Sequence, residues 1–271
     1  VEGIHDSLVR AAAHLPRVDA IGGSAAGVYV DNEVRVASLF RGVSPVDFEK
    51  RIRRIFLDLK ARWNDVPFEV VNDGEVTALA GSMSMNESAV LGLAMGTSEA
   101  VGYVDPEGNV TSMLNELAFA PVDFREDAPI DEWSGDAGCG VQYFSQQAVA
   151  RLAPSAGIAF ADDVPLPERL VEVQQRMADG DEAAARIYRT IGTCLGYAIA
   201  HYAEFYEIRK VLLLGRVTSG KGGSLIVEMA DDVLAAAFPE LEIGLVTPDE
   251  KDKRHGQAVA AASLPVIGGT S

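Results

Sequence analysis

Cysteines, long apolar runs and a secretion signal are scarce or missing in this sequence. Two cysteines among 271 residues, Cys139 and Cys194, cannot build a disulfide framework, and neither belongs to a C-x-x-C pair of a zinc site. A reducing cytoplasm is the compartment that such cysteine usage predicts. No stretch approaches the roughly 18 uncharged apolar residues of a membrane span. Residues 1–10 also lack the apolar core of a secretion signal.

Positive charge is also in short supply. The 23 Lys and Arg residues are outnumbered by 40 Asp and Glu residues, which gives a net charge of −17 and an isoelectric point near 4.6. Such a chain repels nucleic acid and anionic membranes, and no basic stripe relieves the repulsion. The charge therefore argues against these two partners without saying what the protein binds.

The composition is otherwise that of a globular α/β protein. Apolar residues make up 48% of the chain, which has the length of one large or two medium domains. Short apolar runs alternate with helical patterns, as in α/β folds. We expect strands within 18–30, 67–71, 89–96, 101–110 (a hairpin), 211–215 and 242–246, and an acidic loop over 121–138. We expect helices over 4–14, 44–63, 74–82, 140–152, 165–178, 181–206, 226–237 and 256–263.

Asn72 and Asp73 follow a buried strand, where α/β sheets bind their ligands. A carboxylate at this point can accept a proton from a substrate hydroxyl. Asp73 can equally cap the helix that follows, with Glu75 favouring the positive helix N-terminus. From spacing alone the cap is the more common of the two roles.

Two further strand ends carry small residues. Gly96 and Thr97 can let backbone N–H groups approach a phosphate, or form a plain turn. Residues 215–224 resemble a phosphate loop superficially, but G-x-x-x-x-G-K-[ST] is absent because Gly222 follows Lys221. A nucleotide-facing strand, turn and helix remains open there.

Other chemistries find little support in the sequence. The histidines (His5, His14, His201 and His255) are scattered, and no cysteine lies near one at metal-ligand spacing, so we expect no metal site. No G-x-S-x-G elbow supports a hydrolase triad, and Cys139 has no nearby histidine to activate it.

Taken together and in order, these segments resemble the ROK family of sugar kinases and repressors. The resemblance covers roughly residues 18–265. In the first half of the chain, it rests on the segment IGGSAAGVYVDNEV (21–34), on Asn72-Asp73, which match the start of the family's N-D-x-N motif, and on LGLAMGTSEAVGYV (91–104), which resembles its phosphate-2 strand and turn. Further along, Asn115 to Phe119 lie where the family has G-E-x-G-H, and Gly138 to Ser145 resemble the end of its cysteine motif. The segment LLLGRVTSGKGGSLI (212–226) resembles its adenosine-side turn, and HGQAVAAA (255–262) resembles its C-terminal helix.

The resemblance implies a two-lobed α/β fold of the actin-like ATPase (ribonuclease H-like) type. Residues 1–112 would form the N-terminal lobe through the phosphate-2 region, and residues 113–271 the C-terminal lobe. The implied activity is an ATP-dependent hexose kinase that uses Mg²⁺. Asp73 would be the general base, Asn72 and Glu116 would bind the sugar, Gly96 and Thr97 would approach the phosphates, and Gly215, Gly222 and Gly223 would flank the nucleoside.

The chain also departs from the family pattern. Phe119 stands where the family has a zinc-binding histidine, and Val141 where it has a sugar-contacting glutamate, so we expect no zinc. The D-x-G-x-T hairpin of the first phosphate motif is absent from the 271 residues, so we expect a truncated N-terminal lobe. The alternatives are therefore a catalytically impaired pseudokinase or sugar-sensing module, and part of a ROK repressor. A homodimer is compatible with the resemblance.

Overall fold

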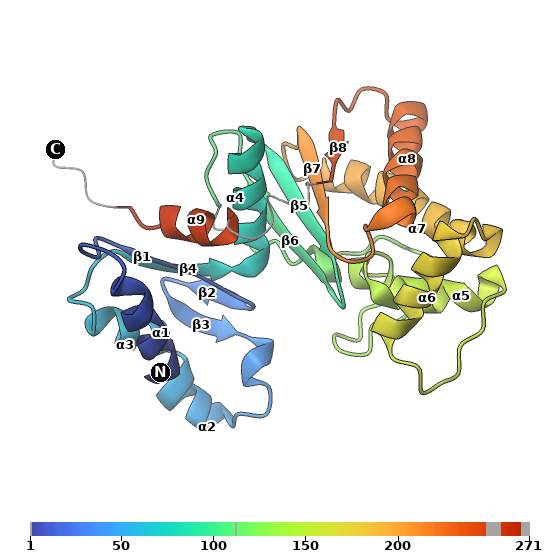
Figure 1. Cartoon of the computed structure of the whole chain (residues 1–271). Coiled ribbons are helices and arrows are strands. Elements are labelled where there is room, and N and C mark those ends of the chain that lie inside the picture. Colours follow the sequence, from blue (N-terminus) through green and yellow to red (C-terminus); the bar gives the residue numbers. More distant parts are fainter. Residues whose placement is uncertain (1, 112, 248–255, 267–271) are drawn as a thin grey trace.

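The computed structural model describes residues 2–111, 113–247 and 256–266. One lobe holds β1 to β4 with α1 to α3, and the other holds β5 to β8 with α5 to α8, while α4 and α9 lie between them (Figure 1). This is the α/β class that the sequence predicts. His255, which opens the C-terminal motif of the resemblance, lies outside the described residues.

A parallel strand pair forms the centre of the first lobe. After α1 (Glu2–Ala12), β1 (Ile21–Ala25) pairs with β4 (Phe68–Asn72), and a hairpin of β2 (Val28–Val30) and β3 (Glu33–Val36) lies beside them. The hairpin tip carries the buried Asn32. Its amide donates to Phe68 O at 2.7 Å and accepts from Val70 N at 2.8 Å. The Asn32 side chain thereby pairs with backbone groups at the free edge of β4, as a neighbouring strand would.

The helix predicted over 44–63 is interrupted. Ser44 caps α2 (Pro45–Asp47), a π-helical turn follows over Phe48–Ile52, and α3 covers Ile55–Ala61. The carbonyl of Arg53 accepts a hydrogen bond from Val34 N of β3 at 2.9 Å. The spacing of apolar residues predicted the buried face of this segment correctly. The helix is nevertheless broken where the backbone of Arg53 forms its hydrogen bond to β3.

A four-stranded mixed sheet forms the second lobe. β5 (Val90–Met95) pairs antiparallel with β6 (Glu99–Val104) and parallel with β7 (Lys210–Leu214), which pairs parallel with β8 (Gly244–Val246). The hairpin predicted over 101–110 is therefore misplaced, since β6 takes its partner from β5. A turn forms within this range at Asp105 and Gly108, but only a single bridge, from Val104 to Val110, flanks it.

Four helices complete the second lobe: α5 (Gln146–Ala156), α6 (Leu166–Ala178), α7 (Glu182–Tyr202) and α8 (Gly220–Ala237). Asp181 caps α7 as predicted, accepting from Ala183 N at 2.7 Å, but the helix ends at Tyr202. α8 begins at Gly220 rather than at Ile226. The predicted glycine turn is thus part of the first turns of this helix, and Gly222 in it packs closely against Tyr188 of α7.

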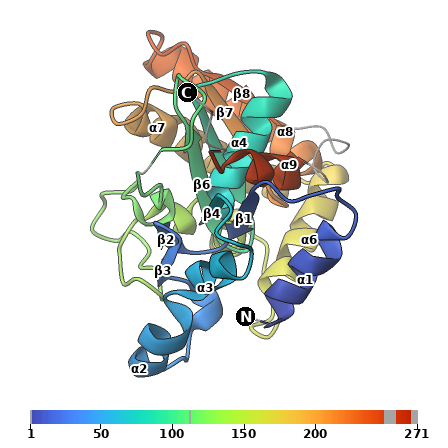
Figure 2. The same cartoon turned by 90° about the vertical axis from the view of Figure 1, so that its left-hand side faces the viewer.

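Two helices connect the lobes. α4 (Asp73–Met85) packs against β5 and β6, and α9 (Gly256–Ser263) packs against α4 and β1. The view in Figure 2 shows α9 lying over β1. Because β5 and β6 share a sheet with β7 and β8, residues 90–104 lie in the second lobe's sheet. The domain boundary at residues 112 and 113 stays a prediction.

Candidate functional site

The end of β4 places Asn72 and Asp73 at the start of α4. Asn72 is the N-cap: its side-chain oxygen accepts from Gly74 N at 2.7 Å, and its amide donates to Gly27 O at 2.8 Å. Asp73 is the first residue of the helix, so the expectation that Asp73 serves as its cap is wrong. The helix is capped by its neighbour, which leaves the half-buried Asp73 carboxylate available for other contacts.

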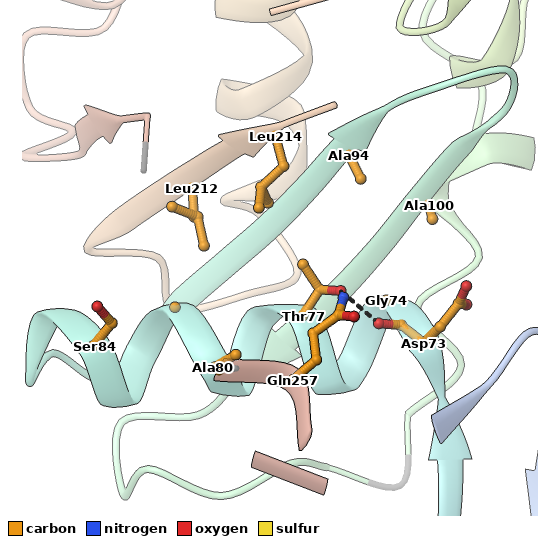
Figure 3. A pocket seen from close by; sticks show the side chains of 12 residues that line it. Asp73, Gly74, Thr77, Ala80, Ser84, Ala94, Ala100, Leu212, Leu214 and Gln257 are labelled. Atoms are coloured by element: carbon orange, nitrogen blue, oxygen red, sulfur yellow. Dashed lines mark hydrogen bonds between the residues drawn. The ribbon is translucent and has the colours of Figure 1, made fainter. Parts of the chain in front are cut away.

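The first of two cavities at Asp73 lies between α4, β5, β7 and α9, and we call it the α9 cavity. It measures about 380 Å³ and is lined largely by small and apolar residues. Figure 3 shows Leu212 and Leu214 facing α4 across it, with Gln257 of α9 at its side. The amide of Gln257 donates to Thr77 Oγ1 at 2.6 Å, and Thr77 Oγ1 donates to Asp73 O at 2.7 Å.

The second cavity, which we call the loop cavity, measures about 440 Å³. One wall comes from residues 26–41 of the first lobe, and the other from residues 98–101 and from the segment after β6 between residues 116 and 147. Figure 2 shows this segment, in light green, beside β2 and β3. Both volumes are of the size that small-molecule sites have, about 300–1,000 Å³. Asp73 and Ala100 line both cavities, so Asp73 stands at their junction.

Carboxylates dominate the loop cavity. Asp73, Glu99, Glu116 and Asp131 line it, and among its described lining residues Arg41 is the single cation. Desolvation and the charge of Asp73 raise the pKa of Glu116, and burial together with Asp73 raises the pKa of Tyr29 to about 12. The Asp73 charge is thus felt both by Glu116 of the second lobe and by Tyr29 of the first.

The loop that carries Glu116 is fastened by a residue whose role the sequence did not show. Glu75 accepts a hydrogen bond from Tyr103 N at 3.1 Å and another from the side-chain amide of Asn115. Burial raises the pKa of Glu75 to about 7. From the sequence, Glu75 was predicted only to interact favourably with the positive N-terminus of the helix. Its apolar neighbour Val76 was the one available signal of burial.

The turn at Gly96 and Thr97, predicted to approach the phosphates, lies beside the turn at Gly215, predicted to flank the nucleoside. Gly215, after β7, has φ +94°, and a Cβ there would come within 2.3 Å of Met95 O at the end of β5. Val217 N donates to the same Met95 oxygen at 3.2 Å. Gly96 and Thr97 follow Met95 directly. The fold therefore brings Gly96, Thr97 and Gly215 to one edge of the sheet, beyond the carboxyl ends of two parallel strands.

Gly222 and Gly223 lie inside α8 and not in the turns after β5 and β7. Both are buried in α8, where a Cβ on Gly222 would meet the Tyr188 ring at 2.4 Å and one on Gly223 would meet Thr218 O at 1.8 Å. Close packing alone thus accounts for these two glycines. Ser219 at the helix N-cap makes no side-chain capping bond, so the first N–H groups of α8 lack that cap.

A metal site is not built from the usual ligands in the part of the chain that the structure describes. No group of three or more His, Cys, Asp and Glu residues is arranged there to hold an ion. Within these same residues, no helix has the length and apolar character needed to cross a membrane.

The chain has extensive structural similarity to solved proteins. No protein-family model matches it, and no curated protein sequence matches it. The ROK hexokinase of Thermus thermophilus superposes with a TM-score of 0.73 at 18% identity, over 98% of this chain and 86% of that one. A ROK family glucokinase from Streptomyces griseus, solved with glucose and AMPPNP, gives 0.69 at 19% identity, over 98% and 88%.

A regulator has the same architecture. A ROK family transcriptional regulator, a homologue of the E. coli MLC protein, gives a TM-score of 0.69 at 18% identity, over 97% of this chain and 67% of that one. The glucokinase and the regulator thus match with the same TM-score of 0.69, and identities this low bear on the fold alone. The expected fold is confirmed: this chain has the actin-like ATPase fold of the ROK sugar kinases and regulators.

Proposed function

We propose that this protein is an ATP-dependent sugar kinase in which Asp73 is the general base. The observation that carries the proposal is the position of Asp73 at the junction of the two cavities. A sugar in the loop cavity and a phosphate donor reached from the α9 side would both lie next to this one carboxylate. The solved neighbours of this fold include a glucokinase with glucose and AMPPNP, which supports the pairing of a sugar with a nucleotide.

In this proposal the loop cavity holds the sugar. Asn72 and Glu116 bind its hydroxyls, and Asp73 accepts the proton of the attacking hydroxyl. Asp73 is partly exposed where the two cavities meet, so its carboxylate can reach a substrate hydroxyl. The Asn72 amide is already held by Gly27 O, so it is positioned before a substrate arrives.

The nucleotide fits the turns at the ends of β5 and β7. Gly96, Thr97 and Gly215 would let phosphates approach the backbone closely, and the N–H groups at the start of α8 suit an anion. Gly222 and Gly223 would support this end of α8 through their packing on Tyr188 and Thr218. Bound MgATP would supply the transferable phosphoryl group and charge neutralisation. We assign no described residue to Mg²⁺.

Replacement of the base tests the proposal. Asp73→Asn should lower phosphoryl transfer from ATP to the preferred hexose by at least about 100-fold, because it removes the proton acceptor with little change in volume. Asp181→Asn is a matched control, since it makes the same change at the start of a helix in the other lobe. Transfer should be followed by a coupled assay on both folded variants. Full turnover by Asp73→Asn would exclude Asp73 as the base.

One observation favours the alternative of a pseudokinase or sugar-sensing module. Among the described residues that line the α9 cavity, none carries a positive charge that could meet a polyphosphate. Calorimetric titration of the unmodified protein separates the two functions. Binding of both MgATP and a hexose is expected for the kinase, whereas sugar binding without nucleotide binding would identify the sensor.

A further inference from the structure

An apolar wall lines the loop cavity in addition to its carboxylates. Phe119, Trp133 and Val141 all line this cavity. The rings of Phe119 and Trp133 are 5.1 Å apart between centroids, with 35° between their planes. Trp133 is 60% exposed, which is unusual for a large indole that packs against another ring. A flat apolar surface is thus open toward the same space as Asp73 and Glu116.

The backbone of Trp133 is fixed by a buried carboxylate. Asp131 is 4% exposed, and its Oδ2 accepts from Trp133 N at 3.1 Å and from Ser134 N at 2.8 Å. Its Oδ1 accepts from the Gln142 side chain at 3.3 Å. These bonds close a tight turn at the tip of the loop. The exposed indole is therefore presented by an ordered segment of chain, as a preorganised binding surface requires.

Phe119 lies at the base of the aromatic pair. It is partly buried against the cluster of Ala118, Cys139 and Val141. The second lobe thus supports the phenyl ring, and the more exposed Trp133 ring packs against it. The exposed Trp133 ring and the partly buried Phe119 ring make an apolar surface whose hydrogen-bonding capacity is small, while Val141, which is 2% exposed, supports Phe119 from within the buried cluster.

Polar groups lie in another part of the lining of this cavity. Asn72, Asp73 and Glu116 offer an amide and two carboxylates to hydroxyl groups. A ligand with hydroxyls on one part and a flat apolar group on another matches both surfaces. A hydroxyl placed on the aromatic wall would lose its water partners without gaining new ones, which is costly.

We propose that the loop cavity takes a sugar bearing a flat apolar substituent, an aryl glycoside in chemical class, with the sugar hydroxyls at Asp73 and Glu116 and the substituent stacked on Trp133 and Phe119. This rests on the proposed function, because it assigns the same cavity to the sugar and defines the class of acceptor. Phe119 and Trp133 would select the substituent during binding and would take no part in phosphoryl transfer.

Trp133 can report its own occupancy. The chain has two tryptophans, and Trp63→Phe leaves Trp133 as the sole indole; Trp63 packs on His5 in the first lobe. We would titrate this variant with matched phenyl and methyl glycosides of glucose, mannose and galactose, in both anomers. The phenyl member of at least one pair should bind about tenfold more tightly and change the Trp133 emission.

Calorimetry on three variants then assigns the effect. Trp133→Ala should remove the preference for phenyl over methyl, and Trp133→Phe should retain most of it. Phe205→Ala, which removes an exposed aromatic side chain just after α7, should leave the preference intact. Equal binding of phenyl and methyl members, no binding of any glycoside, or a preference that survives Trp133→Ala would overturn the proposal.

The test does not depend on catalysis, because only binding is measured. A phenyl preference in a protein that transfers no phosphoryl group would support the aromatic site and contradict the kinase. Turnover that is lost in Asp73→Asn, together with equal binding of phenyl and methyl glycosides, would support the kinase and contradict the aromatic site.

Discussion

At the residue scale, burial alone determines the protonation state of the Glu99 carboxyl group. It is 5% exposed, and neither carboxylate oxygen has a hydrogen-bond partner in the described part of the chain. Burial raises its pKa to about 8, so the carboxyl is neutral at pH 7. Unfolding returns the group to an ordinary pKa. The folded state therefore retains a proton that the unfolded state releases between pH 4.5 and 8.

Protein stability should consequently fall as pH rises through this window. Glu75, whose pKa burial raises to about 7, contributes in the same direction. Glu99→Gln should make the protein more stable than the wild type at pH 9, by about 2–4 kcal/mol, and nearly equal to it at pH 5. Urea unfolding at the two pH values measures this. Glu126→Gln, at an exposed site, is the control, and a Glu99→Gln difference independent of pH would contradict the account.

At the scale of elements, the contact between the turn after β5 and the turn after β7 depends on one glycine. Gly215 combines a positive φ with a close approach to Met95 O. Only a residue without Cβ fulfils both conditions, so the relative placement of the two turns in the proposed nucleotide site depends on it.

Gly215→Ala should therefore destabilise the protein by about 2–4 kcal/mol, because backbone strain and steric overlap add. Gly180→Ala is the matched control: its φ is +85° but nothing lies within 4 Å of the added Cβ, so it should cost only about 1 kcal/mol. Thermal unfolding of both variants checks this. Equal losses in the two variants would show that the contact with Met95 is unimportant.

On the scale of the whole molecule, α9 ties the end of the described chain to its beginning. A Cβ on Gly22 of β1 would come within 1.6 Å of Ala261 O in α9. The helix backbone thus lies directly on the strand, and through α4 it also reaches the second lobe. The two lobes are therefore joined by two helices in contact.

Gly22→Ala should push α9 away from β1 and lower the free energy of unfolding by about 1–3 kcal/mol. Faster cleavage near α9 in limited proteolysis should accompany the loss. Gly3→Ala, where nothing lies within 4 Å, should leave both measurements unchanged or slightly improve stability. Unaltered proteolysis of Gly22→Ala would mean that α9 does not depend on this contact.

The sequence by itself determined the class of fold, most elements and the strand ends that carry the candidate site residues. Strands such as β4, β5 and β7 are short, mainly apolar segments followed by polar or glycine residues, so local pattern was enough to find them. Asn72, Asp73 and Gly96 were identified for the same reason. Asp73's role as base remains a prediction, although the fold that suggested it is confirmed.

Only the tertiary structure decided which distant residues meet. The break at Phe48–Ile52, the start of α8 and the burial of Gly222 all follow from contacts with segments far away in the chain. The same holds for the pairing of Phe119 with Trp133 and for Asp73 lining two cavities. Periodicity reports which face of an element is buried, but not what covers it. Partners and cavities arise only when the lobes are packed together.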